Sequence, residues 1–430
     1  MVKSFYKTAQ ETMSHRDLRA LQLEKLRLSV KFAAERSPLY KTKRLPIDFA
    51  SFDDFSKNIP FTTKRELLEC GIWGNLCVPK ENIAEVHCSS GTSNKPVYSF
   101  LTQKDIREGS EYLARTWYMQ GIREESIFTM FASYGLFSAG LLNHYALRHI
   151  GAFVIPIGNA SALKALEVIS EFGSDTCAAV ASYYPYFIAA TERSGANLKN
   201  LGLKHLIAGG EPFSEKQRQC VEKAFGANLY DQYGLCEINT GLAGECIEKS
   251  GLHILADYAY PEIIDLETGE VLEDDKEGEL VLTTFHKEAS PLIRYRTGDI
   301  TSISHAICAC GRTMPRIART QRRVTDTLFY KGLKIEKPYM ADLLEELSAY
   351  LNPYIWQMEV RTVAGRDELL LKITPNNSSK EAMDHISDHV QKKLSFNLTL
   401  AAFDQEELAR LGHGKLKNFI DHRKDQIQDP

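Results

Sequence analysis

The sequence predicts an α/β protein with a large domain of parallel sheets and helices and a small α+β domain at the carboxyl end. Two patterns carry this prediction. Between about Gln120 and Leu235, short apolar runs alternate with amphipathic segments, which is the βαβ rhythm of a mainly parallel sheet covered by helices. Further along, the predicted elements follow the order β-α-β-β-α-β. We therefore expect a large domain over residues 1–323 and a small, mobile domain over residues 324–430.

The elements of the large domain follow from local spacing. Leu23, Leu26, Val30 and Ala33 repeat at helical intervals, and the pattern ends at Ser37-Pro38. The βαβ part contains the strand GAFVIPIG, the helix SALKALEVISEFG, and the strands CAAVASYY and LKHLIAGGE. After Gly251 the character changes to strands and turns, as in PEIIDLETGEVL and GELVLTTF.

The small domain is predicted from two helical stripes between strands. The segments LFYKGLKI, WQMEVRTV, ELLLKITP and LTLAAF read as strands. The stripes consist of Met340, Leu343, Leu344, Leu347 and Leu351, and of Met383, Ile386, Val390 and Leu394. This order is the ferredoxin-like arrangement.

Composition narrows the class of protein. The chain has 430 residues, of which 43% are hydrophobic and 25% charged, as in soluble globular proteins of two or three domains. A net charge of −4 argues against a nucleic-acid partner. The uncharged stretch 126–147 is long enough to span a bilayer, but its polar residues favour a buried core segment, so we expect no membrane partner.

The compartment is predicted from the amino terminus and the cysteines. The first residues contain no apolar segment typical of a secretory signal. We therefore expect a reducing, cytoplasmic setting. There, nine cysteines indicate metal binding or catalysis rather than disulfides.

The stretch CSSGTSNKPV, residues 88–97, gathers hydroxyls and a lysine around a glycine. Such a loop can bind phosphate, because glycine lets the backbone approach, hydroxyls donate, and lysine supplies positive charge. Ser, Gly, Asn and Pro also make ordinary surface turns. The lysine lacks the context of a Walker A loop. The candidate phosphate-binding residues are Ser89, Ser90, Gly91, Thr92, Ser93 and Lys95.

Three further motifs lie downstream and, together with this loop, form a sequence signature. They are YDQYGLCEI with Tyr233, Gly234 and Glu237, then RYRTGD ending at Asp299, and GHGKLK with Lys415. In this order the four motifs resemble those of adenylate-forming enzymes, and most closely the phenylacetate–CoA ligase family. The resemblance covers nearly the whole chain, including IPFTTKREL, YGLFSAGLLNHY and GGEPFS.

The resemblance implies an AMP-forming reaction with ATP, Mg²⁺ and coenzyme A. A carboxylic acid attacks the α-phosphate of ATP to give acyl-AMP, and a thiol then takes the acyl group. It implies that the loop at residues 89–95 binds the β- and γ-phosphates, Glu237 binds Mg²⁺, and Lys415 reaches the carboxylate and α-phosphate. Asp299 and Arg323 are implied to contact ribose. The implied neighbours of adenine are Gly209, Gly210, Glu211, Asp231, Gln232, Tyr233 and Gly234. Taken singly, the two carboxylates could be turn residues and Lys415 a solvated lysine.

The acid and the acceptor are less sharply defined. Candidates for an acyl pocket are Tyr134, Phe137, Ala139, Gly140 and Ala208, with His144 nearby, although core packing would explain each. Aromatic and small residues suit an aryl or arylacetic acid. Gly332 stands where the family has a glycine beside the CoA channel, or is a hairpin glycine. The acceptor is coenzyme A or the phosphopantetheine of a carrier protein, and a homodimer is a further expectation.

Three departures from the family pattern support a rival hypothesis. Asn94 replaces a glycine, Cys236 replaces Thr or Ser before the glutamate, and Thr325 replaces the hinge aspartate. The rival is a nucleotide-binding protein that has lost catalysis. Retention of Glu237, Asp299 and Lys415 together argues against it, since a dead site needs none of them.

A second constellation consists of three cysteines and a histidine. Cys246 and His253 are followed far downstream by Cys308 and Cys310. Three thiols and an imidazole can complete the tetrahedral shell of a structural zinc ion. The alternative is that the thiols are packed as small hydrophobic groups. Some relatives in the resembled family carry matching cysteine segments, which favours zinc.

Overall fold

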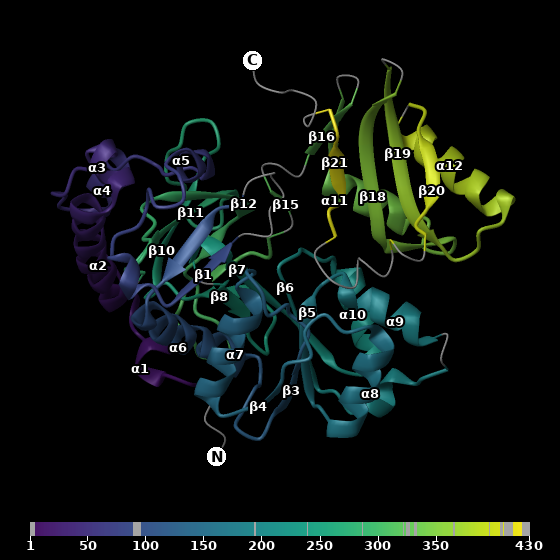
Figure 1. Cartoon of the computed structure of the whole chain (residues 1–430), viewed down its shortest axis with the longest axis horizontal. Coiled ribbons are helices and arrows are strands. Elements are labelled where there is room, and N and C mark those ends of the chain that lie inside the picture. The colour runs from purple at the N-terminus through teal and green to yellow at the C-terminus, as the bar shows by residue number, and fades with distance from the viewer. Residues whose placement is uncertain are drawn as a thin grey trace.

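The structure is a computed structural model (Figure 1). It describes residues 5–88, 96–192, 195–238, 240–285, 287–320, 322–323, 327–330, 333–363, 366–394, 396–404, 407 and 416–423. Within the described residues, no helix is both long enough and apolar enough to cross a membrane. The uncharged stretch 126–147 instead forms strand β3 (Ile127–Met130) and most of helix α7 (Ala139–Ile150), with Phe128, Met130, Ala146 and Leu147 in the core.

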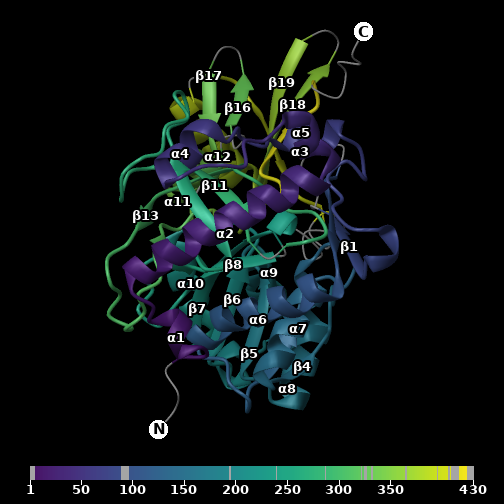
Figure 2. The same ribbon diagram turned by 90° about the vertical axis from the view of Figure 1, so that its left-hand side faces the viewer.

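The amino-terminal helices cover one side of the large domain. They are α1 (Thr8–Glu11), α2 (His15–Arg36), α3 (Pro38–Lys43), α4 (Phe52–Asn58) and α5 (Lys64–Glu69). The side chain of Ser14 caps α2 by accepting from the N–H of Asp17, and Ser37 both ends α2 and caps α3. Figure 2 shows α2 lying across the molecule. The predicted apolar stripe of α2 faces the core, because Leu26 and Val30 are fully buried.

The main sheet confirms the predicted βαβ pattern. Nine strands run in the order β13-β14-β9-β8-β7-β6-β5-β3-β4, and the block β4, β3, β5, β6 and β7 is parallel. The remaining strands of this sheet are β4 (Phe153–Ile155), β5 (Thr176–Val180), β6 (His205–Gly209), β7 (Asn228–Leu235), β8 (Thr240–Glu245), β9 (Leu252–Ile254), β13 (Ile303–Ser304) and β14 (Arg316–Ile317).

Helices cover both faces of the parallel block. One face packs against α8 (Ala162–Phe172), α9 (Tyr183–Glu192) and α10 (Glu215–Phe225), and the other against α6 (Gln103–Met119) and α7. Neighbouring residues of β6 therefore belong to different cores: Leu206 and Ala208 to the first, Ile207 to the second. A strand buried on both sides reads as a continuous apolar run, as this one does.

Two smaller sheets complete the large domain. An antiparallel sheet contains β10 (Ala259–Ile264), β11 (Gly278–Thr284), β12 (Tyr295–Thr301) and β15 (Arg322–Arg323), in that order. The pair β1 (Glu85–Cys88) and β2 (Tyr98–Leu101) is also antiparallel, with His87 opposite Ser99. This pair lies on either side, in the chain, of the predicted phosphate-binding loop.

The small domain has a four-stranded sheet with two helices packed on one face. The sheet order is β20-β19-β18-β21, and β18 pairs with β19 antiparallel. The elements are α11 (Lys337–Glu345), β18 (Leu351–Val363), β19 (Arg366–Pro375), α12 (Lys380–Leu394), β20 (Thr399–Ala402) and β21 (Phe419–Asp421). Met340, Ile386 and Met358 meet in its core, which is separate from the cores of the large domain. Figure 1 shows this domain beside the large one.

One predicted strand of the small domain is different in the structure. The segment LFYKGLKI, expected as one strand, forms a hairpin of β16 (Thr327–Tyr330) and β17 (Leu333–Glu336), which is a sheet of its own. The place beside β18 is taken by β21, which pairs parallel to it.

Candidate active site

The site lies where β7 ends and approaches the antiparallel sheet. Parallel strands leave their carboxyl ends at one edge, and β7 carries Asp231, Gln232, Tyr233 and Gly234 to that edge. The hydroxyl of Tyr233 donates to Asp299 Oδ2 at 2.7 Å. The structure therefore brings the YG motif and the RTGD motif into direct contact, although 66 residues separate them in the chain.

Asp299 is held by a second predicted residue. It faces Arg323 across the β12–β15 pair, and Arg323 Nη2 donates to Asp299 Oδ2 at 3.2 Å. Asp299 is buried, whereas the Arg323 side chain is 40% exposed. Burial and the nearby Asp299 charge raise the pKa of Tyr233 well above its usual value, so its hydroxyl stays a neutral donor. The carboxylate is fixed in place and keeps further lone pairs for a ligand.

Glu237 lies in the short helix η3 (Cys236–Ile238), directly after β7, and is 7% exposed. Its main-chain carbonyl accepts from the amine of Lys287. Burial lowers the pKa of Lys287 to about 8. Burial likewise raises the pKa of the neighbouring Cys236 to about 12, so this thiol is neutral.

The GGE turn follows β6. Gly210 has φ +79, a conformation that glycine adopts without strain, and Glu211 comes next. Glu211 Oε2 accepts from the N–H of Ser182 at 3.0 Å, and Glu211 Oε1 accepts from the N–H of Leu416. The residue that follows Lys415 in the chain is thus bonded to the turn predicted to border adenine.

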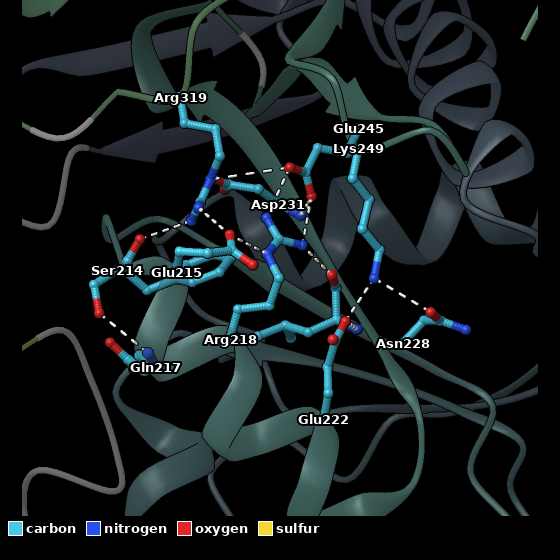
Figure 3. A network of polar contacts seen from close by, with 12 residues as sticks. Ser214, Glu215, Gln217, Arg218, Glu222, Asn228, Asp231, Glu245, Lys249 and Arg319 are labelled. Carbon is cyan, nitrogen blue, oxygen red and sulfur yellow. Dashed lines mark hydrogen bonds and ion pairs between the residues drawn. The ribbon is translucent and has the colours of Figure 1, made fainter. Parts of the chain in front are cut away.

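A buried network of charges surrounds Asp231 (Figure 3). Arg319 Nε donates to Asp231 Oδ2 at 2.9 Å, and Arg319 Nη2 donates to the carbonyl of Phe213 at 2.7 Å. Glu245 is fully buried, accepts from the N–H of Asp231 at 2.7 Å, and pairs with Arg218 at 2.7 Å. Burial raises the pKa of Asp231 to about 6, against the lowering effect of Arg319. The network joins the GGEPF turn to the end of β7.

Sequence reasoning missed this network. One signal was available for Arg218, which stands on the apolar stripe of α10 with Val221 and Phe225. An arginine on a buried stripe needs a buried acid. Nothing in the sequence indicated that Glu245, on another strand, would be that acid.

The predicted acyl-pocket residues are only partly brought together. Tyr134 and His144 line a cavity of about 570 Å³, and Tyr134 Oη lies 3.2 Å from His144 Nδ1. Gly140 is buried at the start of α7, where a Cβ atom would lie 2.2 Å from the carbonyl oxygen of Ser133. Ala208 packs in the core between β6 and the helices and does not line this cavity. Phe137 and Ala139 are half-buried near the start of α7.

The cysteines and the histidine form one cluster. The ligand atoms of Cys246, His253, Cys308 and Cys310 all lie within 4.8 Å of one another. The sulfurs of Cys246 and Cys308 are 3.8 Å apart, and Cys310 Sγ is 3.4 Å from His253 Nε2. His253 Nδ1 is 3.2 Å from the main-chain carbonyl oxygen of Met314, which can only accept a hydrogen bond. Nδ1 therefore carries the proton, and Nε2 keeps its lone pair.

Some predicted residues lie outside the described part of the chain. They are Ser89, Ser90, Gly91, Thr92, Ser93, Lys95, Gly332 and Lys415, and the departures Asn94 and Thr325.

Comparison with known proteins places this site in a family. The AMP-binding enzyme family matches residues 11–285. A phenylacetate–coenzyme A ligase of Aromatoleum evansii is 34% identical over 429 residues, covering 96% of each chain. The protein is thus a member of the AMP-binding enzyme family, whose match covers more than half of the chain. It belongs to the phenylacetate–coenzyme A ligase family.

Solved structures show the same fold. A 2-hydroxyisobutyryl-CoA ligase in the postadenylation state, in complex with an acyl-AMP, is 23% identical and covers 99% of this chain and 94% of its own, with a TM-score of 0.85. The same ligase with CoA in the thioesterification state covers 95% of its own chain and 99% of this one, with a TM-score of 0.72.

Proposed function

We propose that this protein is an AMP-forming acid–thiol ligase. It activates a carboxylic acid with ATP to acyl-AMP and pyrophosphate, and then transfers the acyl group to the thiol of coenzyme A. The observation that carries this proposal is full-length similarity to phenylacetate–coenzyme A ligase, at 34% identity over 96% of both chains. The contacts of Asp299 with Tyr233 and Arg323 agree with it.

In the first half-reaction two anions must be neutralised and aligned. Asp299, anchored by its two donors, accepts from the ribose hydroxyls. Glu237 would hold Mg²⁺, because a hard dication prefers carboxylate oxygen, and the ion would supply positive charge to neutralise the phosphates. Residues 89–95 are assigned to phosphate binding, and Lys415 is assigned to the reacting carboxylate. Support for the last role is the bond from Leu416 to Glu211.

The adenine site is assigned to the turn after β6 and the end of β7. Gly209, Gly210 and Glu211 form one wall, and Asp231 to Gly234 form the other. Arg319 supports this assignment, because it donates hydrogen bonds to the Asp231 carboxylate and to the Phe213 carbonyl. It therefore connects the end of β7 to the GGEPF turn.

The acid is assigned to the aryl or arylacetic class. The cavity beside Tyr134 and His144 is apolar along Leu141, Pro156 and Ile157, which suits a flat ring. Arg148 at its border could pair with a second polar group on the acid.

The second half-reaction is assigned to a rotated small domain. The boundary between residues 323 and 324 agrees with the chain, because β15 ends at Arg323 and β16 begins at Thr327. The higher TM-score to the postadenylation structure supports assigning the present arrangement to the first half-reaction. Gly332 would border the pantetheine channel after rotation.

The Cys246 cluster is assigned to a structural zinc ion. Zinc–sulfur bonds of about 2.3 Å in a tetrahedron separate two sulfurs by about 3.8 Å, which matches the distance between Cys246 and Cys308. With four protein ligands no position is left for substrate, so the ion would have a structural role.

The deciding experiment is a panel of aryl, arylacetic and fatty acids with ATP and Mg²⁺. We expect pyrophosphate and AMP with an aromatic acid, and a thioester when coenzyme A is added. Transfer of the acyl group to a carrier protein in place of coenzyme A would identify the carrier protein as the acceptor. ADP instead of AMP as the product would refute adenylation. ATP binding without turnover of any acid would favour the degenerate nucleotide-binding protein. Sedimentation of the same sample tests the predicted homodimer.

A further inference from the structure

Lys287 is a buried amine that none of the sequence motifs contains. It is 4% exposed and lies after β11, between Phe285 and Ser290. Lysine is almost never so deeply buried unless its charge has partners, because an unpaired ammonium in an apolar medium is costly.

The partners of Lys287 come from two separate parts of the site. Its Nζ donates to Ser99 Oγ at 2.6 Å and to the main-chain carbonyl of Glu237. Ser99 lies on β2, the strand that follows the predicted phosphate-binding loop, and Glu237 lies in η3. The amine therefore connects the chain on the exit side of that loop to the turn that presents the predicted magnesium carboxylate.

The backbone around Lys287 is fixed by further buried groups. Asp105 accepts from the N–H of Glu288 at 2.7 Å and of Ala289 at 3.1 Å. Ser290 Oγ accepts from the N–H of Phe100 at 3.2 Å. The segment is thus bonded to α6 and β2, so the position of the amine is set by the large domain alone.

Lys287 and Glu237 also share a wall of one cavity. This cavity has a volume of about 230 Å³ and is lined by Ser99, Ser290 and several apolar residues. Glu237 thus lines the same cavity as the amine from which its main-chain carbonyl accepts a hydrogen bond.

We propose that Lys287 is a positioning residue for Mg²⁺–ATP, which acts by holding the Glu237 turn and β2 at a fixed separation. The proposal rests on the proposed function, in which Glu237 is the magnesium carboxylate. Without this amine, η3 and β2 can move apart, and the Glu237 carboxylate is no longer held in one position relative to the metal. Residues that orient a metal ligand in this way typically contribute about 10- to 100-fold in metal affinity or activity.

The test is ATP binding by calorimetry with Mg²⁺ and with EDTA. We expect Mg²⁺ to increase the affinity of the wild-type protein for ATP. Lys287→Met should lose about 10- to 100-fold of this Mg²⁺-dependent gain in affinity. Its affinity for ATP in EDTA should equal that of the wild type. Lys104→Met is the matched control, because Lys104 pairs at 3.3 Å with Glu288, next to Lys287 in the chain, yet is 49% exposed. A Lys287→Met protein that keeps the full gain would overturn the proposal.

A second variant guards against loss of folding. Ser99→Ala keeps the lysine but removes one acceptor, and it should reduce the Mg²⁺-dependent gain less than Lys287→Met. In the double variant the two losses should fall short of their sum, since contacting residues are not independent. Full additivity, or equal loss of ATP binding with and without Mg²⁺, would contradict a positioning role.

The same proteins separate this inference from the proposed function. Wild-type protein that binds Mg²⁺–ATP but activates no acid would refute the ligase activity and leave the binding comparison to decide the role of Lys287. Where the wild type is active, Lys287→Met should slow pyrophosphate release. It should still make thioester from presynthesised phenylacetyl-AMP and coenzyme A at a rate within about threefold of normal, because that step needs no Mg²⁺–ATP. Equal damage to both steps would overturn the inference.

Discussion

Asp231 is a carboxylate whose surroundings have opposite effects on its ionisation. Arg319 stabilises the ionised form, but burial and the nearby Glu245 oppose it, and burial has the larger effect. The pKa of about 6 therefore lies above the usual value of 3.8. A group of this kind binds its proton more tightly in the folded protein than in the unfolded chain.

The contribution of Asp231 to the free energy of unfolding should therefore fall as pH rises from about 4 to about 6. Asp231→Asn removes the titration, so the free energy of unfolding of the variant relative to wild type should increase by about 2 kcal/mol between pH 4.5 and pH 7. Urea unfolding at the two pH values measures this difference, with the exposed Asp53→Asn as control. A difference that does not change with pH would show that Asp231 titrates normally.

At this scale the sequence predicted residues that belong to motifs and missed those that do not. Tyr233 and Asp299 were both predicted as site residues because their motifs were recognised, but the contact between them was found only in the structure. Arg319, Glu245 and Lys287 belong to none of the recognised motifs, and a single charged residue carries no period or spacing. Their roles follow from which strands come together, and that is known only from the fold.

Among the elements, β8 joins two features of the molecule. Glu245 at its end belongs to the charge network around Asp231, and the next residue, Cys246, belongs to the cysteine cluster. The opposite side of the cluster, Cys308 and Cys310, lies between β13 and β14. A metal ion there would connect these segments and hold the end of β8 in place.

We expect about one zinc ion per chain on metal analysis of the purified protein. Cys308→Ser should lower the melting temperature more than it alters acyl-AMP formation in the folded fraction, because four protein ligands leave no position on the ion for substrate. Cys220→Ser, at an exposed cysteine of α10, is the control. Metal-free protein of unchanged stability would refute the zinc assignment.

Elements with a clear period were predicted, and those without one were not. The βαβ order and the stripes of α2 and α12 follow from repeated apolar positions, whereas the stripe predicted over residues 340–351 runs past α11, since Leu347 lies after its last residue and Leu351 begins β18. The hairpin of β16 and β17 was read as one strand, because its apolar residues continue on both sides of a two-residue connection. Strand β21 has only three residues, too few for any pattern, and its place beside β18 depends on tertiary packing.

For the whole molecule, the two half-reactions are expected to use different placements of the small domain. By the predicted boundary, Glu237 and Asp299 belong to the large domain and Lys415 to the small one. Leu416 contacts Glu211 in the present arrangement. A residue delivered by one domain to a site on the other serves only the step for which the two are docked.

Lys415→Ala should therefore reduce acyl-AMP formation by about 10²-fold or more, since a positioned cation at a developing charge contributes several kcal/mol. The variant should still convert presynthesised acyl-AMP and coenzyme A to thioester at a near-normal rate. Lys417→Ala serves as the matched control and should keep both activities. Loss of both steps in Lys415→Ala would mean a structural role, and normal adenylation would assign the role to another cation.

Strand β21 has a consequence for the segment that carries this lysine. Phe419, Ile420 and Asp421 pair with β18, and Asn418 donates to the carbonyl of Trp356 at 2.8 Å, so the chain returns to the sheet after Lys415. On its other side the chain leaves the sheet at β20. Leu416, two residues before the anchored Asn418, is therefore held close to the sheet of the small domain. The hydrogen bond from Leu416 to Glu211 then ties this sheet to the large domain, so a rotation of the small domain would have to break it.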